Sequence, residues 1–260
     1  MTVNKTIFFI SSEEEYLNAK ETLDINKTIS GVNALFNAPH KKAKWLIKHN
    51  IDIHNIEEKT GRNALFYCDC YTAPLLIKKG IDVNVVDKFG NNALFMAKSI
   101  SKVKILLKAG ININQVNDMN QNALFKFGDN PQVSRLLIES GIDINHVDKF
   151  GQNALPLASY ETFKILVDKG IKINQINNQG NSLLSWVDYA KAKILVDKIY
   201  DFSEFTDEKM DELYNRGCMP SEKRDLITRR ILQLKLLEEK KIIEKNMICV
   251  DTQPPTKKRL

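Results

Sequence analysis

The residues with the clearest potential for chemistry are two cysteines, Cys68 and Cys70, which lie downstream of His40 and His49. Thiolates and imidazoles bind zinc, and a thiol paired with an imidazole is a typical nucleophile. Cys68, however, takes the place that a small residue holds in similar segments of the chain, namely Ala38, Ala97 and Ala158. A small buried thiol explains this position, so the sequence favours packing over a metal or catalytic cysteine site.

Other catalytic patterns do not stand out along the chain. It lacks a glycine-rich phosphate loop, a nucleophile elbow and a zinc-protease helix, and its four histidines lie at unrelated positions. We therefore predict a protein that is not an enzyme, with no catalytic residues, no metal site and no cofactor.

The composition is that of a soluble globular protein, since 43% of the 260 residues are apolar and 27% are charged. No stretch approaches the roughly 20 apolar residues of a membrane span, and glutamates at 13–15 interrupt the apolar start in a way that a secretory signal would not tolerate. Four cysteines are too few for a disulfide scaffold, which indicates a reducing compartment. We expect a cytoplasmic protein, with secretion into a host cell without a cleaved signal peptide as the alternative.

The sequence assigns the formal net charge of +6 to the C-terminal segment. Residues 216–260 contain 12 Lys and Arg against 6 Asp and Glu, so residues 1–215 are neutral in sum. A folded body without net charge argues against nucleic acid as its partner.

A repeated tetrapeptide predicts the architecture. Asn-Ala-Leu-Phe returns, with changes in the last copies, at intervals of 28 to 31 residues, and the copies begin at Asn33, Asn63, Asn92, Asn122, Asn153 and Asn181. A second mark of the type Gly-Ile-Asp-Val-Asn follows after about 18 residues, as at 80–84. Two marks at one spacing identify a repeat array. A degenerate first copy begins at Asn4, and the last copy, from Asn181, has a degenerate second mark at 199–203. The array therefore has about seven units, and we assign residues 1–203 to it.

Each unit is expected to hold two helices and a projecting turn. Asn is a favoured N-cap, so a short first helix should begin at each Asn of the tetrapeptide. A second helix carries paired leucine or isoleucine residues and ends on a glycine such as Gly80 or Gly110, where a left-handed backbone costs little. The second mark is predicted to be extended and to lead into a turn such as 87–90.

This pattern closely resembles the ankyrin repeat over about four fifths of the chain. The Thr-Pro-Leu-His motif of that family corresponds to Asn-Ala-Leu-Phe here, although these units are shorter than the 33 residues typical of the family. The resemblance implies that Phe and Asn replace residues that hydrogen-bond neighbouring repeats. Apolar contacts of a buried column would then substitute for those bonds, the column being Phe36, Phe66, Phe95 and Phe125. The short units also resemble ankyrin segments of some enterobacterial secreted effectors.

Two sets of residues are candidates for binding a partner. In an ankyrin array the turn tips face solvent, and three central tips hold large apolar residues, which we call the tip ladder: Phe89, Met119 and Phe150, flanked by Lys88 and Lys149. The residues that directly follow the last residue of the tetrapeptide vary from unit to unit, as suits recognition on the concave side. We call these the first-helix positions: Tyr67, Met96, Lys126 and Leu157. The alternatives are that the tip rings only close the array and that the first-helix positions drift freely.

After the array, residues 204–247 are predicted to form capping helices. A short helix is expected over 207–215 and a long one from an N-cap at Ser221 to about Asn246. The basic residues of the long helix suggest a nucleic-acid or membrane surface. Interleaved glutamates and a broad apolar face favour instead a helix docked on the open end of the array.

Residues 248–260 are expected to be a disordered basic tail, in which Lys257-Lys258-Arg259 could serve as a targeting signal. Together these features predict an all-α ankyrin-repeat solenoid of about seven short helix-turn-helix units with projecting turns, closed by a C-terminal helical cap. We expect a monomeric, non-enzymatic adaptor or inhibitor that binds another protein and has no small-molecule substrate. The alternative is a secreted bacterial effector or toxin-related protein with activity or targeting in the C-terminal segment.

Overall fold

The computed structural model describes residues 7–198, 206–215 and 220–251. The chain divides into two compact units, Met1–Ile171 and Lys172–Leu260. The degenerate first copy at Asn4 and the expected array boundary at 203 lie outside the described residues, as does the tail beyond 251.

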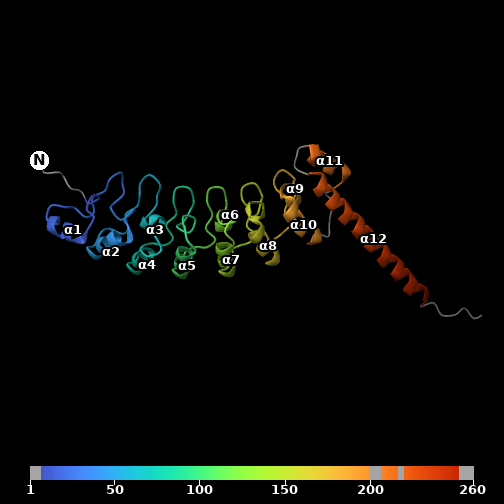
Figure 1. The fold of residues 1–260 in the computed structure, drawn as a ribbon, viewed down its shortest axis with the longest axis horizontal. Helices are drawn as coiled ribbons and strands as arrows, with labels where there is room; N and C mark the ends of the chain where they lie inside the picture. The colour runs from blue at the N-terminus through green and yellow to red at the C-terminus, as the bar shows by residue number, and fades with distance from the viewer. Residues whose placement is uncertain (1–6, 199–205, 216–219, 252–260) are drawn as a thin grey trace, which may run out of the picture. The chain divides into compact units, whose positions relative to one another are not determined.

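The first unit is a helical solenoid in which short helices alternate with projecting turns (Figure 1). Its helices are α1 (Glu13–Ala19), α2 (His40–Lys48), α3 (Ala64–Tyr67), α4 (Ala73–Lys78), α5 (Ile100–Lys108), α6 (Ala123–Lys126), α7 (Pro131–Glu139) and α8 (Tyr160–Asp168), with a 3₁₀ turn η1 (Leu155–Leu157). Helices α2, α4, α5, α7 and α8 follow one another along one side, and the projecting turns lie on the opposite side (Figure 1). This is the all-α arrangement that the repeats predict.

The second unit holds α9 (Leu183–Trp186), α10 (Tyr189–Lys198), α11 (Asp207–Asn215) and α12 (Ser221–Asp251). Helix α11 matches the short helix expected over 207–215. No β-strand forms within the described ranges, where extended pairing is limited to isolated bridges, Ile29 with Val32 and Ile176 with Ser182.

The second helices of the first unit end on a residue with positive φ, as the sequence predicts, and some of them also begin at a side-chain cap. Ser99 caps α5 by accepting a hydrogen bond from the amide of Lys102. At the other end, Gly110 adopts φ +81° and lets the amide of Ile111 donate to the carbonyl of Leu106 at 3.2 Å. Equivalent residues with positive φ close the other second helices: Asn50, Gly80, Gly141 and Gly170.

The first helix of each repeat is a single turn or less. Helices α3 and α6 have four residues each, whereas 34–37 and 93–96 form only hydrogen-bonded turns. The predicted cap is confirmed, because the side chain of Asn63 accepts a hydrogen bond from the amide of Leu65 at 3.1 Å. The last copy differs from the prediction: Ser182, and not Asn181, precedes α9 as its N-cap.

The second mark ends in a turn, as at 83–84, so the prediction that the whole segment is extended is wrong. Asp82 Oδ1 accepts a hydrogen bond from the amide of Asn84 at 2.8 Å. Asn84 Oδ1 then accepts the amide of Asn112 in the next repeat at 2.7 Å, and Asn114 Oδ1 accepts that of Asp143 at 2.8 Å. Because an Ile-x-Ile stretch without a partner strand leaves its backbone groups unpaired, short polar side chains bond to them and form turns instead.

These bonds correct the expectation that apolar contacts replace the polar links between repeats. The tetrapeptide Asn adds a bond within its own repeat, as where Asn92 Nδ2 donates to the carbonyl of Asn112 at 2.8 Å. Equivalent bonds join Asn33 to Asp52, Asn63 to Asp82 and Asn122 to Asp143. The phenylalanine column is buried as predicted, at 2 to 7% exposure, so polar and apolar contacts act together.

In the second unit, the N-terminal part of α12 packs against α10. Ile227 is fully buried, and Lys223 Nζ donates to the carbonyl of Val187 at the end of α9, at 2.9 Å. Ser221 is the first residue of α12 and not its cap. The helix runs to Asp251, past the expected end at Asn246, and therefore includes the first residues that the sequence assigns to the tail.

Lys102 places an amino group in the core of the first unit. The residue is 3% exposed, and its Nζ donates to the carbonyls of Phe66 (3.2 Å) and Cys68 (2.7 Å) in the preceding repeat. A second helix thereby satisfies carbonyls that the short first helix of its neighbour leaves unpaired. Burial lowers the pKa of Lys102 below its ordinary value of 10.5.

We expect Lys102→Met to change how stability depends on pH. The folded chain holds the Lys102 proton less tightly than the unfolded chain, so between the lowered pKa and 10.5 the unfolded state binds more protons and stability rises with pH. The variant lacks this group, so the free energy of unfolding of the parent should rise relative to that of the variant as the pH increases from the lowered pKa toward 10.5. Urea denaturation of both proteins measures this, and a constant difference would contradict a desolvated ammonium group.

Candidate protein-binding surface

One polar side chain holds the tip of each projecting turn. Asp87 Oδ1 accepts hydrogen bonds from the amides of Phe89 (3.0 Å) and Asn91 (2.9 Å). Asn117 and Asp148 do the same in the turns that carry Met119 and Phe150. Each residue of the tip ladder therefore stands on a tight turn of defined conformation.

Backbone hydrogen bonds join successive turns. They run from the amides of Lys88, Asp118 and Lys149 to the carbonyls of Thr60, Phe89 and Met119, at 2.8, 2.9 and 3.0 Å. Two of these acceptors belong to the tip ladder itself, so each tip is fixed to the next. Figure 1 shows the turns side by side along one edge of the first unit.

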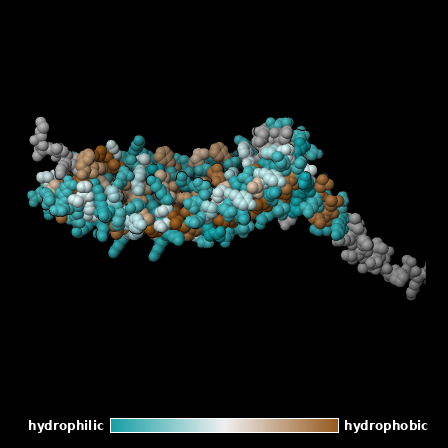
Figure 2. All heavy atoms as spheres, viewed as in Figure 1, coloured by the Kyte–Doolittle hydropathy of each residue, from teal (hydrophilic) through white to brown (hydrophobic). Residues whose placement is uncertain are grey.

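The side chains of the tip ladder are exposed to solvent. Phe89, Met119 and Phe150 are 55%, 41% and 54% exposed. Figure 2 shows apolar patches along the edge of the first unit where the projecting turns lie. Val86, in the same turn as Phe89, is also exposed and is not among the predicted residues. The equivalent valines of the next two repeats, Val116 and Val147, are only part-exposed. Exposed apolar residues that cluster in this way are typical of interaction surfaces.

A buried ion pair supports the turn of Phe89. Arg62 reaches Asp87 Oδ2 with both Nε (2.8 Å) and Nη2 (2.7 Å), and the Asp87 side chain is fully buried. Burial opposes the charge of Arg62, but the contacts with Asp87 and with the hydroxyl of Tyr67 raise its pKa above the ordinary value. The pair fixes the carboxylate that in turn bonds to the amide of Phe89.

Gly90 allows two neighbouring turns to approach closely. Its φ is +79°, and a Cβ at this position would lie 2.8 Å from the Cα of Asn117 in the next turn. Gly110 has a similar φ of +81°, yet a Cβ there would meet no atom within 4 Å. The two glycines therefore separate the cost of a positive φ from the cost of a steric clash.

We expect Gly90→Ala to destabilise the protein more than Gly110→Ala does. The positive φ alone should cost about 1–2 kcal/mol at either position. At Gly90 the clash with the backbone of Asn117 adds about 1–3 kcal/mol, because a backbone atom cannot move aside as a flexible side chain would. Chemical denaturation of both variants measures the difference, and equal losses would show that the turns are not held in close contact.

The first-helix positions differ in exposure. Tyr67, Lys126 and Leu157 are exposed, whereas Met96 is half-buried. The Tyr67 hydroxyl donates to Glu57 Oε2 at 2.6 Å, and the same carboxylate accepts the hydroxyl of Thr60. The bonds from Thr60 and Tyr67 lower the pKa of Glu57. Tyr67 thus connects a first-helix position to a projecting turn.

The structure places Cys68 in the core. Its Sγ contacts the carbonyl of Leu65 at 3.6 Å, and burial raises the pKa of the thiol to about 11, which disfavours the reactive thiolate. His40 and His49 have other neighbours: the His40 ring lies 3.3 Å from the Thr72 hydroxyl, and His49 contacts Glu13. Within the part of the chain that the structure describes, no three His, Cys, Asp or Glu residues form a group that could hold a metal ion.

None of the helices in the described ranges is long and apolar enough to cross a membrane.

Comparison with known proteins agrees with this geometry. A search of curated proteins gave no match. The family model for ankyrin repeats (3 copies) matches residues 93–177, the stretch that runs from the turn before α5 past α8 and contains Met119 and Phe150. Residues 93–177, with their paired helices and projecting turns, are therefore ankyrin repeats.

Proposed function

We propose that the chain is a non-enzymatic adaptor or inhibitor, monomeric on its own, that binds a partner protein through the tip ladder and the first-helix positions. Ankyrin repeats generally serve as protein-protein interaction modules. The observation that carries the proposal is the row of exposed apolar side chains at Phe89, Met119 and Phe150, on turns that backbone bonds join to one another.

This arrangement suits binding energetically. An apolar side chain contributes most to affinity when it sits at the centre of an interface and its backbone is already ordered before binding. The bonds from Asp87 and between the turns supply that order. Lys88 and Lys149 are exposed beside the ladder, and Lys126 adds a third basic residue from the first-helix positions. A partner with an apolar patch rimmed by acidic residues would complement this surface.

Co-purification from the native cell tests the proposal. The tagged full-length chain should retain a specific protein, and the variant Phe89→Ser, Met119→Ser, Phe150→Ser should not. A matched control changes two exposed aromatic residues outside the turns, Tyr71→Ser and Tyr160→Ser, and should retain the partner. Recognition through the tip ladder would be contradicted if the control variant also lost the partner, or if the tip-ladder variant retained it.

A further inference from the structure

The second helices of three successive repeats concentrate positive charge. Residues 40–48, 73–79 and 100–108 contain nine lysines and neither Asp nor Glu, whereas α7 and α8 carry both signs. Seven of these lysines are exposed: Lys41, Lys44, Lys48, Lys78, Lys79, Lys104 and Lys108. Acidic residues elsewhere in 1–215 balance them, so this local concentration of positive charge does not show in the net charge of the segment.

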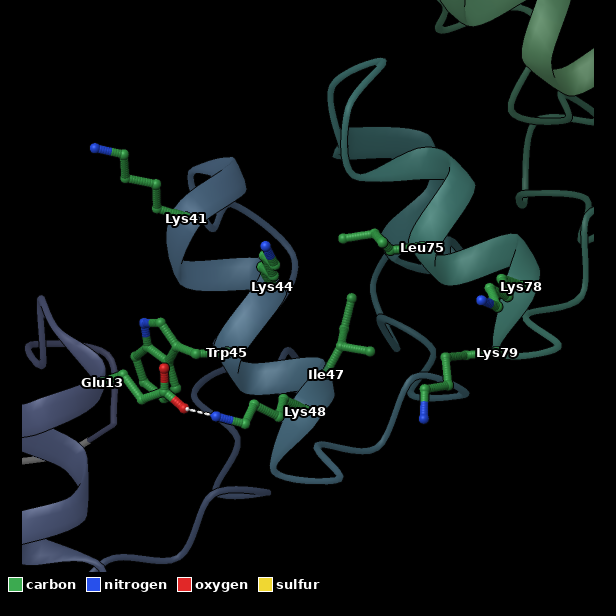
Figure 3. A pocket seen from close by; sticks show the side chains of 9 residues that line it. All are labelled: Glu13, Lys41, Lys44, Trp45, Ile47, Lys48, Leu75, Lys78 and Lys79. Atoms are coloured by element: carbon green, nitrogen blue, oxygen red, sulfur yellow. Dashed lines mark hydrogen bonds and ion pairs between the residues drawn. The ribbon is translucent and has the colours of Figure 1, made fainter.

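A groove of about 770 Å³ lies between α2 and α4, with α1 at its rim. Its apolar floor consists of Ile47 and Leu75, and Figure 3 shows both directed into the space between the two helices. Trp45 also lines the groove, but it lies on the side of α2 that faces Glu13 (Figure 3). Five lysines surround the floor: Lys41, Lys44, Lys48, Lys78 and Lys79.

Glu13 is the one carboxylate that lines the groove among the residues described. Its Oε1 accepts a hydrogen bond from Lys48 Nζ at 2.8 Å, drawn in Figure 3, and lies 2.9 Å from His49 Nε2. Lys48 and His49 hold the pKa of Glu13 below its ordinary value, so the carboxylate stays ionised and offsets the charge of Lys48. The other four lysines leave the groove with a positive rim around an apolar floor.

We propose that this groove binds an acidic amphipathic segment of a partner protein. Carboxylates of the segment would pair with the rim lysines, and its apolar side chains would cover the half-buried Leu75. A nucleic acid would meet the rim but has no aliphatic groups for the floor, and Trp45 is too buried, at 5% exposure, to stack on a base. A flat membrane surface would contact the lysines without reaching into the groove.

The inference rests on the proposed function, since it gives a protein-binding module a second partner surface. The groove lies among the second helices, on the side of the first unit opposite the projecting turns (Figure 1). Figure 2 shows hydrophilic side chains that extend from this edge. Substitutions in the groove and in the tip ladder can therefore be tested separately.

Anisotropy titrations with a designed peptide test the inference. The probe is a fluorescein-labelled helix of about 16 residues with leucines at helical spacing and glutamates elsewhere, added to the full-length chain. Lys41→Glu, Lys44→Glu, Lys78→Glu should weaken binding at least about tenfold. The control Lys98→Glu, Lys164→Glu, Lys169→Glu has the same net charge but lies outside the groove, and it should bind as the parent does. A peptide with alanines in place of the leucines should bind the parent more weakly.

Circular dichroism checks that each variant is folded, and the milder Lys→Gln changes at the same three groove positions should still weaken binding if the Glu variant unfolds. Equal weakening by the groove and control variants would overturn the inference, as it would indicate diffuse electrostatic attraction. Groove-dependent binding of a single-stranded oligonucleotide or of phosphatidylserine vesicles, without binding of the peptide, would also overturn it. The tip-ladder variant should bind the peptide as the parent does, so failure of the ladder and failure of the groove give different results.

Discussion

Phe95→Ala is expected to lower the free energy of unfolding by about 3–5 kcal/mol. Phe95 is 5% exposed and belongs to the buried column that runs through the first unit. Truncating its ring leaves a cavity that the close-packed neighbours fill only in part, so the loss exceeds the transfer free energy of the ring alone. Chemical denaturation followed by circular dichroism measures the change.

Phe89→Ala is the matched control, because it makes the same chemical change at a ring that is 55% exposed. We expect it to cost less than about 1 kcal/mol, as surface substitutions usually do. If both variants lost a similar amount of unfolding free energy, the column and the tips would not differ in burial in the way that the structure shows.

Removal of the tip ladder should abolish partner binding and spare the fold. Interface residues of this type each contribute about 2 kcal/mol or more, so the variant Phe89→Ser, Met119→Ser, Phe150→Ser should bind the captured partner at least about a hundredfold more weakly. The turns keep their backbone bonds, because Asp87, Asn117 and Asp148 are unchanged. The thermal midpoint should therefore stay within about 2 °C of the parent value.

The repeat arrangement could be predicted because the residues that recur in it are those that its backbone conformation requires. Gly110 must adopt a positive φ to end α5, and Asn63 must accept the amide of Leu65, so these residue types return wherever the geometry does. The same spacing predicted that Phe89, Met119 and Phe150 would occupy equivalent turn positions. Local chemistry repeated at a fixed interval is readable from sequence alone.

The conformation of the second mark could not be predicted correctly, because it depends on hydrogen-bond partners outside the mark. Ile81 and Val83 alternate with polar residues as in a strand, but Asp82 bonds to the amide of Asn84 and Asn84 bonds to the next repeat. The alternation therefore reflects side chains that face inward from a series of turns. The conformation of the second mark is therefore decided by hydrogen bonds between residues 28 positions apart, and not by the strand propensity of its own residues.

The net charge hides the basic groove. It is a sum along the chain, whereas the fold places Lys44 and Lys78 on neighbouring helices and puts most of the balancing carboxylates elsewhere. Lysines on the second helices were a signal that could have been found by comparing equivalent helices. The end of α12 past Asn246 also had a signal, since Pro254-Pro255 lies three residues beyond Asp251 and proline commonly follows a helix C-terminus at that distance.

The most direct test of the central claim is a calorimetric titration of the captured partner into the parent and into the tip-ladder variant, with thermal unfolding of the same samples. We predict that the heat of binding is lost in the variant while its unfolding midpoint is nearly unchanged. An affinity equal to that of the parent, together with a midpoint several degrees lower, would contradict the account. It would show that Phe89, Met119 and Phe150 close the array and that recognition lies elsewhere, with the first-helix positions next to be tested.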